Sequence, residues 1–165
     1  KTGFAKKYAK WISETLSCDM ISLDDLNKND IKDYDMIIYG SGIMAGQLYQ
    51  LDKVSKMIDS NQRLYVYACG AIDKDAKDII LKIKDNCILK LGRDVPFYYF
   101  QAGLSYETMG FIYKQMLKAM YKSLLKKKEK TSEEEEMMKA LKESHDDSKQ
   151  TDIDEFIKNI KQGLN

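Results

Sequence analysis

The chain has 165 residues, 44% of them hydrophobic, which is enough for one domain to bury a core without disulfides or metals. Its 27 Lys and Arg residues almost balance 26 Asp and Glu residues, and the net charge of +1 provides no field that would select nucleic acid. Cys18, Cys69 and Cys87 lie far apart without metal-type spacing, which predicts reduced thiols in a cytoplasmic protein and no metal site. No apolar run approaches the roughly 20 residues that span a bilayer, so any membrane contact is expected to be peripheral, at the inner membrane face.

The first part of the chain is typical of a helix followed by two strands. Apolar residues recur at helical spacing over residues 4–16, which predicts a helix that begins just after Gly3. Residues 19–23 alternate between polar and apolar like a short strand. Residues 34–39 indicate a longer, mostly buried strand that Gly40 ends.

The middle of the chain continues this alternation. A glycine-rich stretch at residues 40–46 leads into a helix over residues 48–58, and a buried strand follows at residues 63–68. A further helix from about residue 75 precedes an aromatic strand at residues 97–100. Strands that alternate with helices of this length are typical of a parallel sheet covered on both faces, so the predicted fold class is a doubly wound α/β sandwich.

The last third of the chain is predicted to be helical. Residues 105–128 indicate one long helix, a second helix begins at Thr131 with acidic residues in its first turn, and a final amphipathic helix covers residues 152–160. We therefore predict a single domain over residues 1–165 with a helical insertion at about residues 105–147.

The helix start at Thr2 and Gly3 is a candidate phosphate site. A helix N-terminus presents unpaired backbone N–H groups and the positive end of the helix dipole, so it favours a phosphate without any cationic side chain. Gly3 would allow the backbone to approach the phosphate closely, and the Thr2 hydroxyl could donate a further hydrogen bond. The alternative interpretation is an ordinary threonine cap.

Three short segments, in their order along the chain, resemble the flavodoxin family. Residues 1–5, Lys-Thr-Gly-Phe-Ala, resemble its phosphate loop, residues 40–46 resemble its first isoalloxazine loop, and residues 68–71, Ala-Cys-Gly-Ala, fall where its second flavin loop should be. The resemblance implies an FMN-binding oxidoreductase on a flavodoxin-like sheet of strand order 2-1-3-4-5. It assigns the cofactor contacts to Thr2, Gly3, Phe4 and Ala5, to Ser41, Gly42, Ile43, Met44, Ala45 and Gly46, and to Ala68, Cys69, Gly70 and Ala71.

Two features depart from the family pattern. The family's central first strand should precede Lys1 and is absent from this sequence, so we expect additional polypeptide upstream. Ala5 stands where flavodoxins commonly have a hydroxyl residue. One hydrogen bond to the phosphate would then be missing, which predicts a weaker affinity for FMN.

The second half of the chain resembles one subgroup more closely. Residues 100–106, the long basic helix after them, and residues 151–156 are similar to the quinone-dependent protoporphyrinogen oxidases, which are themselves flavodoxin-like. This resemblance implies a dehydrogenase that oxidises a porphyrinogen-type substrate and reduces a quinone, and it assigns no catalytic residue. The alternative is a small electron-carrier flavodoxin that docks on a redox partner protein. Carriers are typically strongly acidic, whereas this chain is nearly neutral.

Other interpretations of these residues stay open. The glycine-rich stretch can be a plain strand-to-helix connection, and Cys69 can be a small packed residue and not a redox thiol. A cofactor-free interaction domain of the same fold is a further alternative, whereas a response-regulator receiver would need an aspartate where Gly40 and Ser41 stand. His145, the only histidine, lies in a polar stretch and is predicted to be a surface residue.

The helix predicted at residues 105–128 is amphipathic and basic. Apolar residues fill one arc of its helical wheel and lysines at four-residue spacing form a stripe opposite, namely Met109, Ile112, Tyr113, Met116, Leu117, Met120 and Leu124 against Lys114, Lys118, Lys122 and Lys126. This helix can pack its methionine-rich face on the sheet domain, with the lysines solvated. It can also lie on an anionic membrane surface, with Phe111 and Leu125 inserted.

Overall fold

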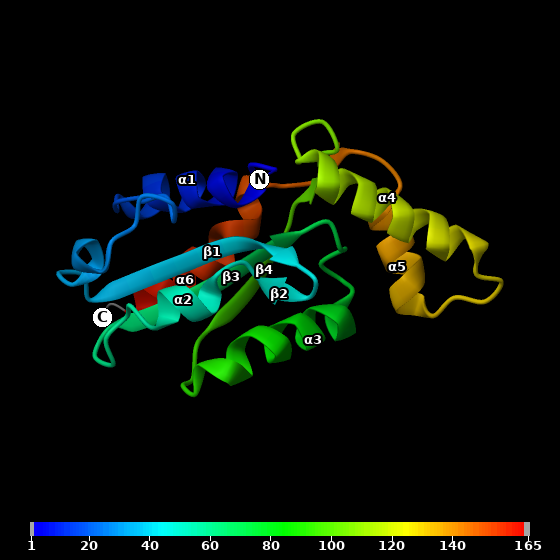
Figure 1. Cartoon of the computed structure of the whole chain (residues 1–165). Coiled ribbons are helices and arrows are strands. Elements are labelled where there is room, and N and C mark those ends of the chain that lie inside the picture. Colours follow the sequence, from blue (N-terminus) through cyan, green and yellow to red (C-terminus); the bar gives the residue numbers. More distant parts are fainter. Residues whose placement is uncertain (1, 164–165) are drawn as a thin grey trace.

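A parallel ladder of three strands forms the centre of the computed structural model, which describes residues 2–163. Strand β1 (Met36–Met44) pairs with β3 (Arg63–Gly70), and β3 pairs with β4 (Phe97–Gln101). The sheet order is β2-β1-β3-β4, where β2 (Gln47–Leu48) is a short antiparallel strand beside the end of β1. The carboxyl ends of the three parallel strands therefore lie at one edge of the sheet (Figure 1).

Helices cover both faces of this sheet, which confirms the predicted doubly wound α/β class (Figure 1). Along β3, Leu64 and Val66 join the core formed with α2 (Leu51–Ser55) and α3 (Lys77–Ile88). The alternate residues Tyr65 and Tyr67 join a second core with α1 (Phe4–Leu16) and α6 (Asp154–Gly163). Successive side chains of a strand point to opposite faces, so a strand buried on both faces is apolar at successive positions, as β3 is from Leu64 to Cys69. The short 3₁₀ helices are η1 (Lys28–Ile31), η2 (Leu89–Leu91) and η3 (Gln150–Ile153).

The prediction of a strand at residues 19–23 is wrong. This segment is irregular and exposed, with Met20 and Ile21 at 46% and 42% exposure. A strand needs a neighbour for its N–H and C=O groups. In the order 2-1-3-4-5 that neighbour would be the first strand, and within residues 2–163 the outer edge of β1 pairs only with β2, through Ile43 and Met44.

The glycine-rich stretch 40–46 is a strand end and a tight turn, and not the strand-to-helix loop that the sequence predicts. Strand β1 continues through it to Met44 and then returns as β2. The two turn residues, Ala45 and Gly46, have φ of 50° and 74°, as the favoured two-residue hairpin turns require. The hairpin uses the residues that were expected to open the next helix, so α2 begins only at Leu51.

The insertion begins and ends in a two-stranded stem. Strand β5 (Gly103–Leu104) pairs antiparallel with β6 (His145–Asp146), and α4 (Phe111–Lys126) and α5 (Ser132–Leu141) lie between them, beyond the carboxyl ends of the sheet (Figure 1). Position 103 requires glycine because a Cβ there would lie 2.1 Å from the carbonyl oxygen of His145.

Of the two helices in the insertion, the start of α5 is predicted correctly and the start of α4 is not. Helix α4 begins six residues later than position 105, because residues 105–110 turn and bury Tyr106 and Met109 in the small core of the insertion. The start of α5 is confirmed: the Thr131 hydroxyl accepts the backbone N–H of Glu134, whose carboxylate accepts that of Thr131. Among residues 2–163 no helix combines the length and apolarity needed to cross a bilayer.

Candidate functional site

The start of α1 lies beside the carboxyl edge of the sheet, and within residues 2–163 no side chain caps its first N–H groups. The N-cap is Gly3 at φ 88°, so the alternative of an ordinary threonine cap does not apply to Thr2, and the first turn holds no acidic residue. The helix is fixed there by Tyr8, whose hydroxyl donates to the carbonyl of Gln101 at the end of β4. This arrangement suits a bound anion.

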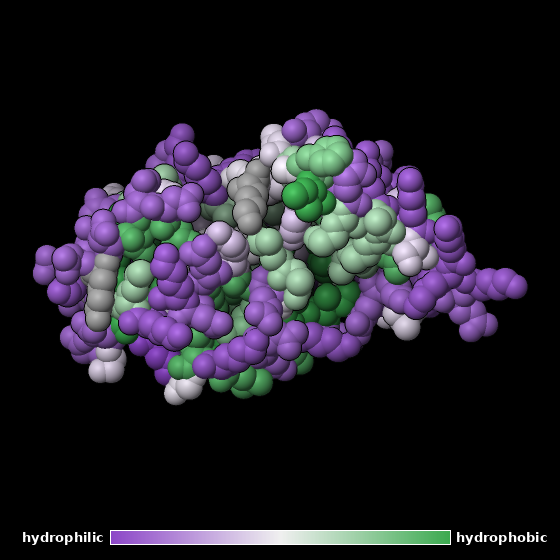
Figure 2. Space-filling view, in the orientation of Figure 1, coloured by the Kyte–Doolittle hydropathy of each residue, from purple (hydrophilic) through white to green (hydrophobic). Residues whose placement is uncertain are grey.

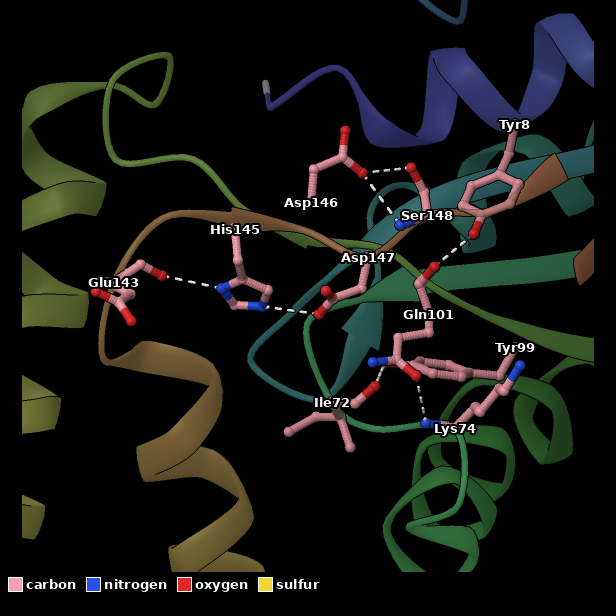
Figure 3. Close-up of polar contacts among 10 residues, drawn as sticks. All are labelled: Tyr8, Ile72, Lys74, Tyr99, Gln101, Glu143, His145, Asp146, Asp147 and Ser148. Atoms are coloured by element: carbon pink, nitrogen blue, oxygen red, sulfur yellow. Dashed lines mark hydrogen bonds and ion pairs between the residues drawn. The ribbon is translucent and has the colours of Figure 1, made fainter.

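Lys7 ties the same end of α1 to the stem of the insertion. Its ammonium group donates to Asp146 at 2.8 Å. The hydroxyl of Ser148 donates to the other carboxylate oxygen of Asp146 at 2.5 Å, as Figure 3 shows. Burial acts to raise the pKa of Asp146, but the hydrogen bonds from Lys7 and Ser148 outweigh it and the pKa is lowered. The insertion is thus anchored by charge to the helix that begins at Gly3.

The end of β1 supplies the first predicted flavin segment. Ser41 is buried, accepts the backbone N–H of Tyr49 at 3.1 Å and donates to the carbonyl of Gly42, so its hydroxyl is engaged in the hairpin. Gly42, Ile43, Met44 and Gly46 are half-buried and Ala45 is exposed. The side chain of Ile43 reaches across to β3, 3.3 Å from where a Cβ on Gly70 would stand. The two predicted flavin segments therefore touch.

The end of β3 supplies the second predicted segment, but only half of it faces the site. Ala68 and Cys69 are buried in the two opposite cores of the sheet. Burial raises the pKa of the Cys69 thiol to about 12, which leaves it protonated and favours the packed-residue interpretation over a redox thiol. Gly70 and Ala71 are half-buried, and Ala71 also packs against the small core of the insertion. These two residues remain as the part of the segment that a ligand could contact.

Polar groups that the sequence did not single out hold the loop after Ala71 against β4. The hydroxyl of Tyr99 donates to the carbonyl of Ile72 at 2.7 Å, and the amide oxygen of Gln101 accepts the backbone N–H of Lys74 at 3.2 Å (Figure 3). Lys74 also pairs with Asp152 at 3.1 Å, an interaction that raises the pKa of Lys74. A polar residue directly after an aromatic strand was the one available signal for Gln101.

His145 and Asp147 form a second polar group beside the second flavin segment. The prediction of a surface histidine is only partly right, since the His145 side chain is 24% exposed. Its Nδ1 lies 2.9 Å from the carbonyl of Glu143 and its Nε2 lies 3.7 Å from Asp147 (Figure 3). The backbone N–H of Asp147 donates to Ala102, whose own N–H donates to the carbonyl of Gly70. An imidazole and a carboxylate thus stand one strand away from the flavin segment.

The residues at this edge fit a phosphorylated, partly apolar ligand. Uncapped N–H groups at Gly3 suit a phosphate, and the half-buried apolar side chains of Ile43, Met44 and Ala71 suit the face of a flat ring. Nothing in residues 2–163 groups three or more His, Cys, Asp or Glu side chains around a metal position.

A parallel sheet wound on both faces, with a free helix N-terminus at its carboxyl edge, defines an α/β protein of flavodoxin type. A sequence model described as "Flavodoxin domain" matches residues 1–133, and the chain belongs to this family. An uncharacterized protein of Methanocaldococcus jannaschii is 32% identical over 68 residues, which are 38% of this chain and 43% of that protein. The chain therefore spans less than half the length of this relative. No solved structure matches the chain.

Proposed function

We propose that this domain binds FMN and transfers electrons through it. The observation that carries the proposal is the uncapped start of α1 at Gly3, beside the half-buried ends of β1 and β3. Thr2, Gly3, Phe4 and Ala5 would hold the phosphate, chiefly through backbone N–H groups. When bound, FMN supplies one- and two-electron redox chemistry.

The chain's own residues would bind and orient the isoalloxazine ring of FMN. Ile43 and Met44 would cover one side and exclude water, and Gly70 and Ala71 would bring backbone amide groups to its edge. The hydrogen bonds of Tyr99 and Gln101 would keep the second segment in place while the ligand enters. Ser41, Ala68 and Cys69 would act indirectly, by holding the two strand ends in register.

Within this function, we favour an enzyme over a carrier. The near-neutral charge lacks the acidic surface that helps carrier flavodoxins to dock on basic partners. The insertion adds a wall beside the site, with His145 and Asp147 available to exchange protons with a bound substrate. The resemblance to protoporphyrinogen oxidases supports a porphyrinogen-type substrate and a quinone acceptor, while the carrier alternative would require a redox partner protein.

The test of FMN binding compares two glycines with positive φ in the full natural protein. Gly3 and Gly92 both have positive φ, 88° and 65°, and a Cβ at either would meet nothing within 4 Å. Each substitution to alanine should cost about 1–2 kcal/mol of stability. Only Gly3→Ala should weaken FMN binding, by tenfold or more, because only that backbone faces the phosphate. Quenching of FMN fluorescence gives both dissociation constants.

Colourless protein that takes up no added FMN would overturn the proposal and leave the cofactor-free interaction domain. The choice between enzyme and carrier is a separate measurement. A spectroelectrochemical titration should give a less negative potential for the second electron than acidic carriers show, since a neutral surface repels the reduced, anionic flavin less. An equally low potential, together with no quinone reduction, would favour the carrier.

A further inference from the structure

Helix α4 leaves half of its apolar arc uncovered. Tyr113, Leu117 and Leu124 pack into the small core of the insertion. Ile112 and Met116, which were predicted to share that face, are instead 84% and 50% exposed. The expectation that the methionine-rich arc packs on the rest of the molecule is therefore right for only one side of the helix.

The exposed side of α4 consists of three parallel rows at four-residue spacing. The first row is apolar and contains Ile112, Met116 and Met120. The second row is uncharged and contains Gln115, Ala119 and Ser123. The third row is basic and contains Lys118, Lys122 and Lys126. Phe111 adds a 74% exposed ring in the first turn. Figure 2 shows hydrophobic atoms gathered over the first half of α4 and hydrophilic atoms over its end.

The lysines of α4 form no salt bridge within the described residues, and only Lys114 lies close enough to a carboxylate, that of Glu107, to help lower its pKa. Helix α4 holds four lysines and no acidic residue. None of the salt bridges in residues 2–163 includes Lys114, Lys118, Lys122 or Lys126, although Lys118 lies 5.7 Å above the ring of Tyr106. The nearest acidic helix, α5, uses Glu134 to pair with Lys127, beyond the end of α4.

We propose that this face of α4 docks the protein on an anionic lipid bilayer. An anionic bilayer has charged headgroups directly above its hydrocarbon. A helix that lies flat on it can insert its apolar row into the hydrocarbon while its basic row contacts the headgroups. A second copy of the chain would bring two basic rows together, and an acidic protein would neutralise the lysines without taking up Phe111 and Ile112. Lysine stems can reach along the helix to the headgroups while the first turn inserts.

This docking would bring the candidate cofactor site close to the membrane. Helix α4 lies beyond the carboxyl ends of β1, β3 and β4, the same edge at which Gly3 and Gly70 stand (Figure 1). A lipid-soluble acceptor would then have a short path to the site. The inference itself goes beyond FMN binding, since the α4 surface is complete without a bound flavin.

The test measures partitioning of the full natural protein on vesicles by co-sedimentation at low salt. Phosphatidylcholine vesicles are compared with vesicles that also contain phosphatidylglycerol, with and without FMN. We expect binding to the anionic vesicles only, and equal binding in the presence and absence of FMN. A protein that fails to bind FMN should therefore still bind the anionic vesicles, and a protein that fails to bind the vesicles can still bind FMN.

Three sets of variants locate the surface. Replacement of Lys118, Lys122 and Lys126 by Gln should lower the partition coefficient roughly 100-fold, because each lysine near the headgroups contributes about fivefold. Phe111→Ser with Ile112→Ser should lower it about tenfold or more. The matched control replaces by Gln three exposed lysines in or next to helices of the sheet domain, Lys53, Lys56 and Lys90. It changes the net charge by the same amount and should change the partition coefficient less than threefold.

Entry of the first turn of α4 into the bilayer can be measured by fluorescence. In a Trp11→Phe background, Phe111→Trp should shift its emission to the blue on phosphatidylglycerol vesicles and not on phosphatidylcholine alone. The proposal is overturned if wild type does not bind the anionic vesicles, or if the control triple variant loses as much binding as the α4 triple variant. A concentration-dependent dimer that Ile112→Ser abolishes would assign the face to a second copy instead.

Discussion

The backbone of Gly40 lies directly against the ring of Tyr67, where a Cβ on residue 40 would stand 1.8 Å from the ring carbon that carries the hydroxyl. Tyr67 is buried, and its hydroxyl donates to the carbonyl of Ala5 in the first turn of α1 at 3.0 Å. The glycine is therefore needed for packing: it admits the side chain that holds the start of α1 on the sheet. Its role at the candidate phosphate site is indirect.

Gly40→Ala should lower the free energy of unfolding by about 1–3 kcal/mol, because the added methyl overpacks a buried contact. Denaturant titration followed by circular dichroism measures it. Tyr67→Phe is the control: it keeps the ring and loses one hydrogen bond, so it should cost only about 1 kcal/mol. If Gly40→Ala unfolds at the wild-type denaturant concentration, the close contact with Tyr67 is not a feature of the folded protein.

The elements that could be predicted from the sequence are those whose signal is local. Burial on both faces makes β3 apolar from Leu64 to Cys69, and the spacing of Phe4, Tyr8 and Ile12 marks one face of α1. The strand expected at residues 19–23 failed because pairing is a property of the neighbour and not of the segment. The hairpin after Met44 was missed because Ala-Gly is a weak turn signal, and the turn forces Ala45 into a conformation that alanine rarely adopts.

The residues of the candidate site also differ in whether a local sequence signal marks them. Gly3 could be found because a glycine at a helix start is visible in the sequence. Gln101, Lys74 and Asp152 come together only in the folded chain, where Lys74 and Asp152 pair across 78 positions, so no spacing rule reaches them. Cys69 was placed in the site by its position in a loop pattern, whereas the alternation of β3 turns its side chain into the core.

Ala45→Gly should stabilise the protein by about 0.5–1 kcal/mol. Ala45 has φ 50°, a conformation that costs an L-residue about 1–2 kcal/mol, and glycine escapes most of that cost while losing more chain entropy. Thermal and denaturant unfolding measure the change. Ala119→Gly in the exposed part of α4 is the same substitution at helical φ and should destabilise by about 1 kcal/mol. Equal effects of the two substitutions would contradict the assigned turn.

The three thiols should differ sharply in reactivity. Cys18 is exposed, whereas Cys69 and Cys87 are buried. Burial raises the pKa of Cys69 to about 12, and the pKa of Cys18 is also raised, by partial burial and the nearby Asp19, so Cys18 is set apart by the access of reagent to its thiolate. Only the thiolate reacts, so a short iodoacetamide pulse near pH 8 should label Cys18 alone, and the other two should label after denaturation. Mass spectrometry of tryptic peptides reads each site. The Cys18→Ser variant should show no fast phase, and fast labelling of Cys69 would show that the end of β3 opens.

The pair of Lys7 and Asp146 should make stability fall in acid. The folded pKa of Asp146 is lowered from the ordinary 3.8, so its contribution is complete above that value and is lost as the pH falls through the lower, folded pKa. The side chains are 37% and 49% exposed, which limits the coupling to about 1 kcal/mol or less at pH 7.

A double-mutant cycle of Lys7→Gln and Asp146→Asn, measured by denaturant unfolding at pH 7 and again near pH 3, tests this contribution. The coupling should be present at pH 7 and shrink in acid, because protonation of Asp146 removes the charge that Lys7 pairs with. Lys10 and Glu14 give the matched pair on the same helix: their atoms are 3.7 Å apart and the side chains 68% and 57% exposed, so their coupling should be smaller. A coupling for Lys7 and Asp146 that is the same at both pH values would mean that the contact works through packing and not through charge, and that the stem of the insertion is not held to α1 electrostatically.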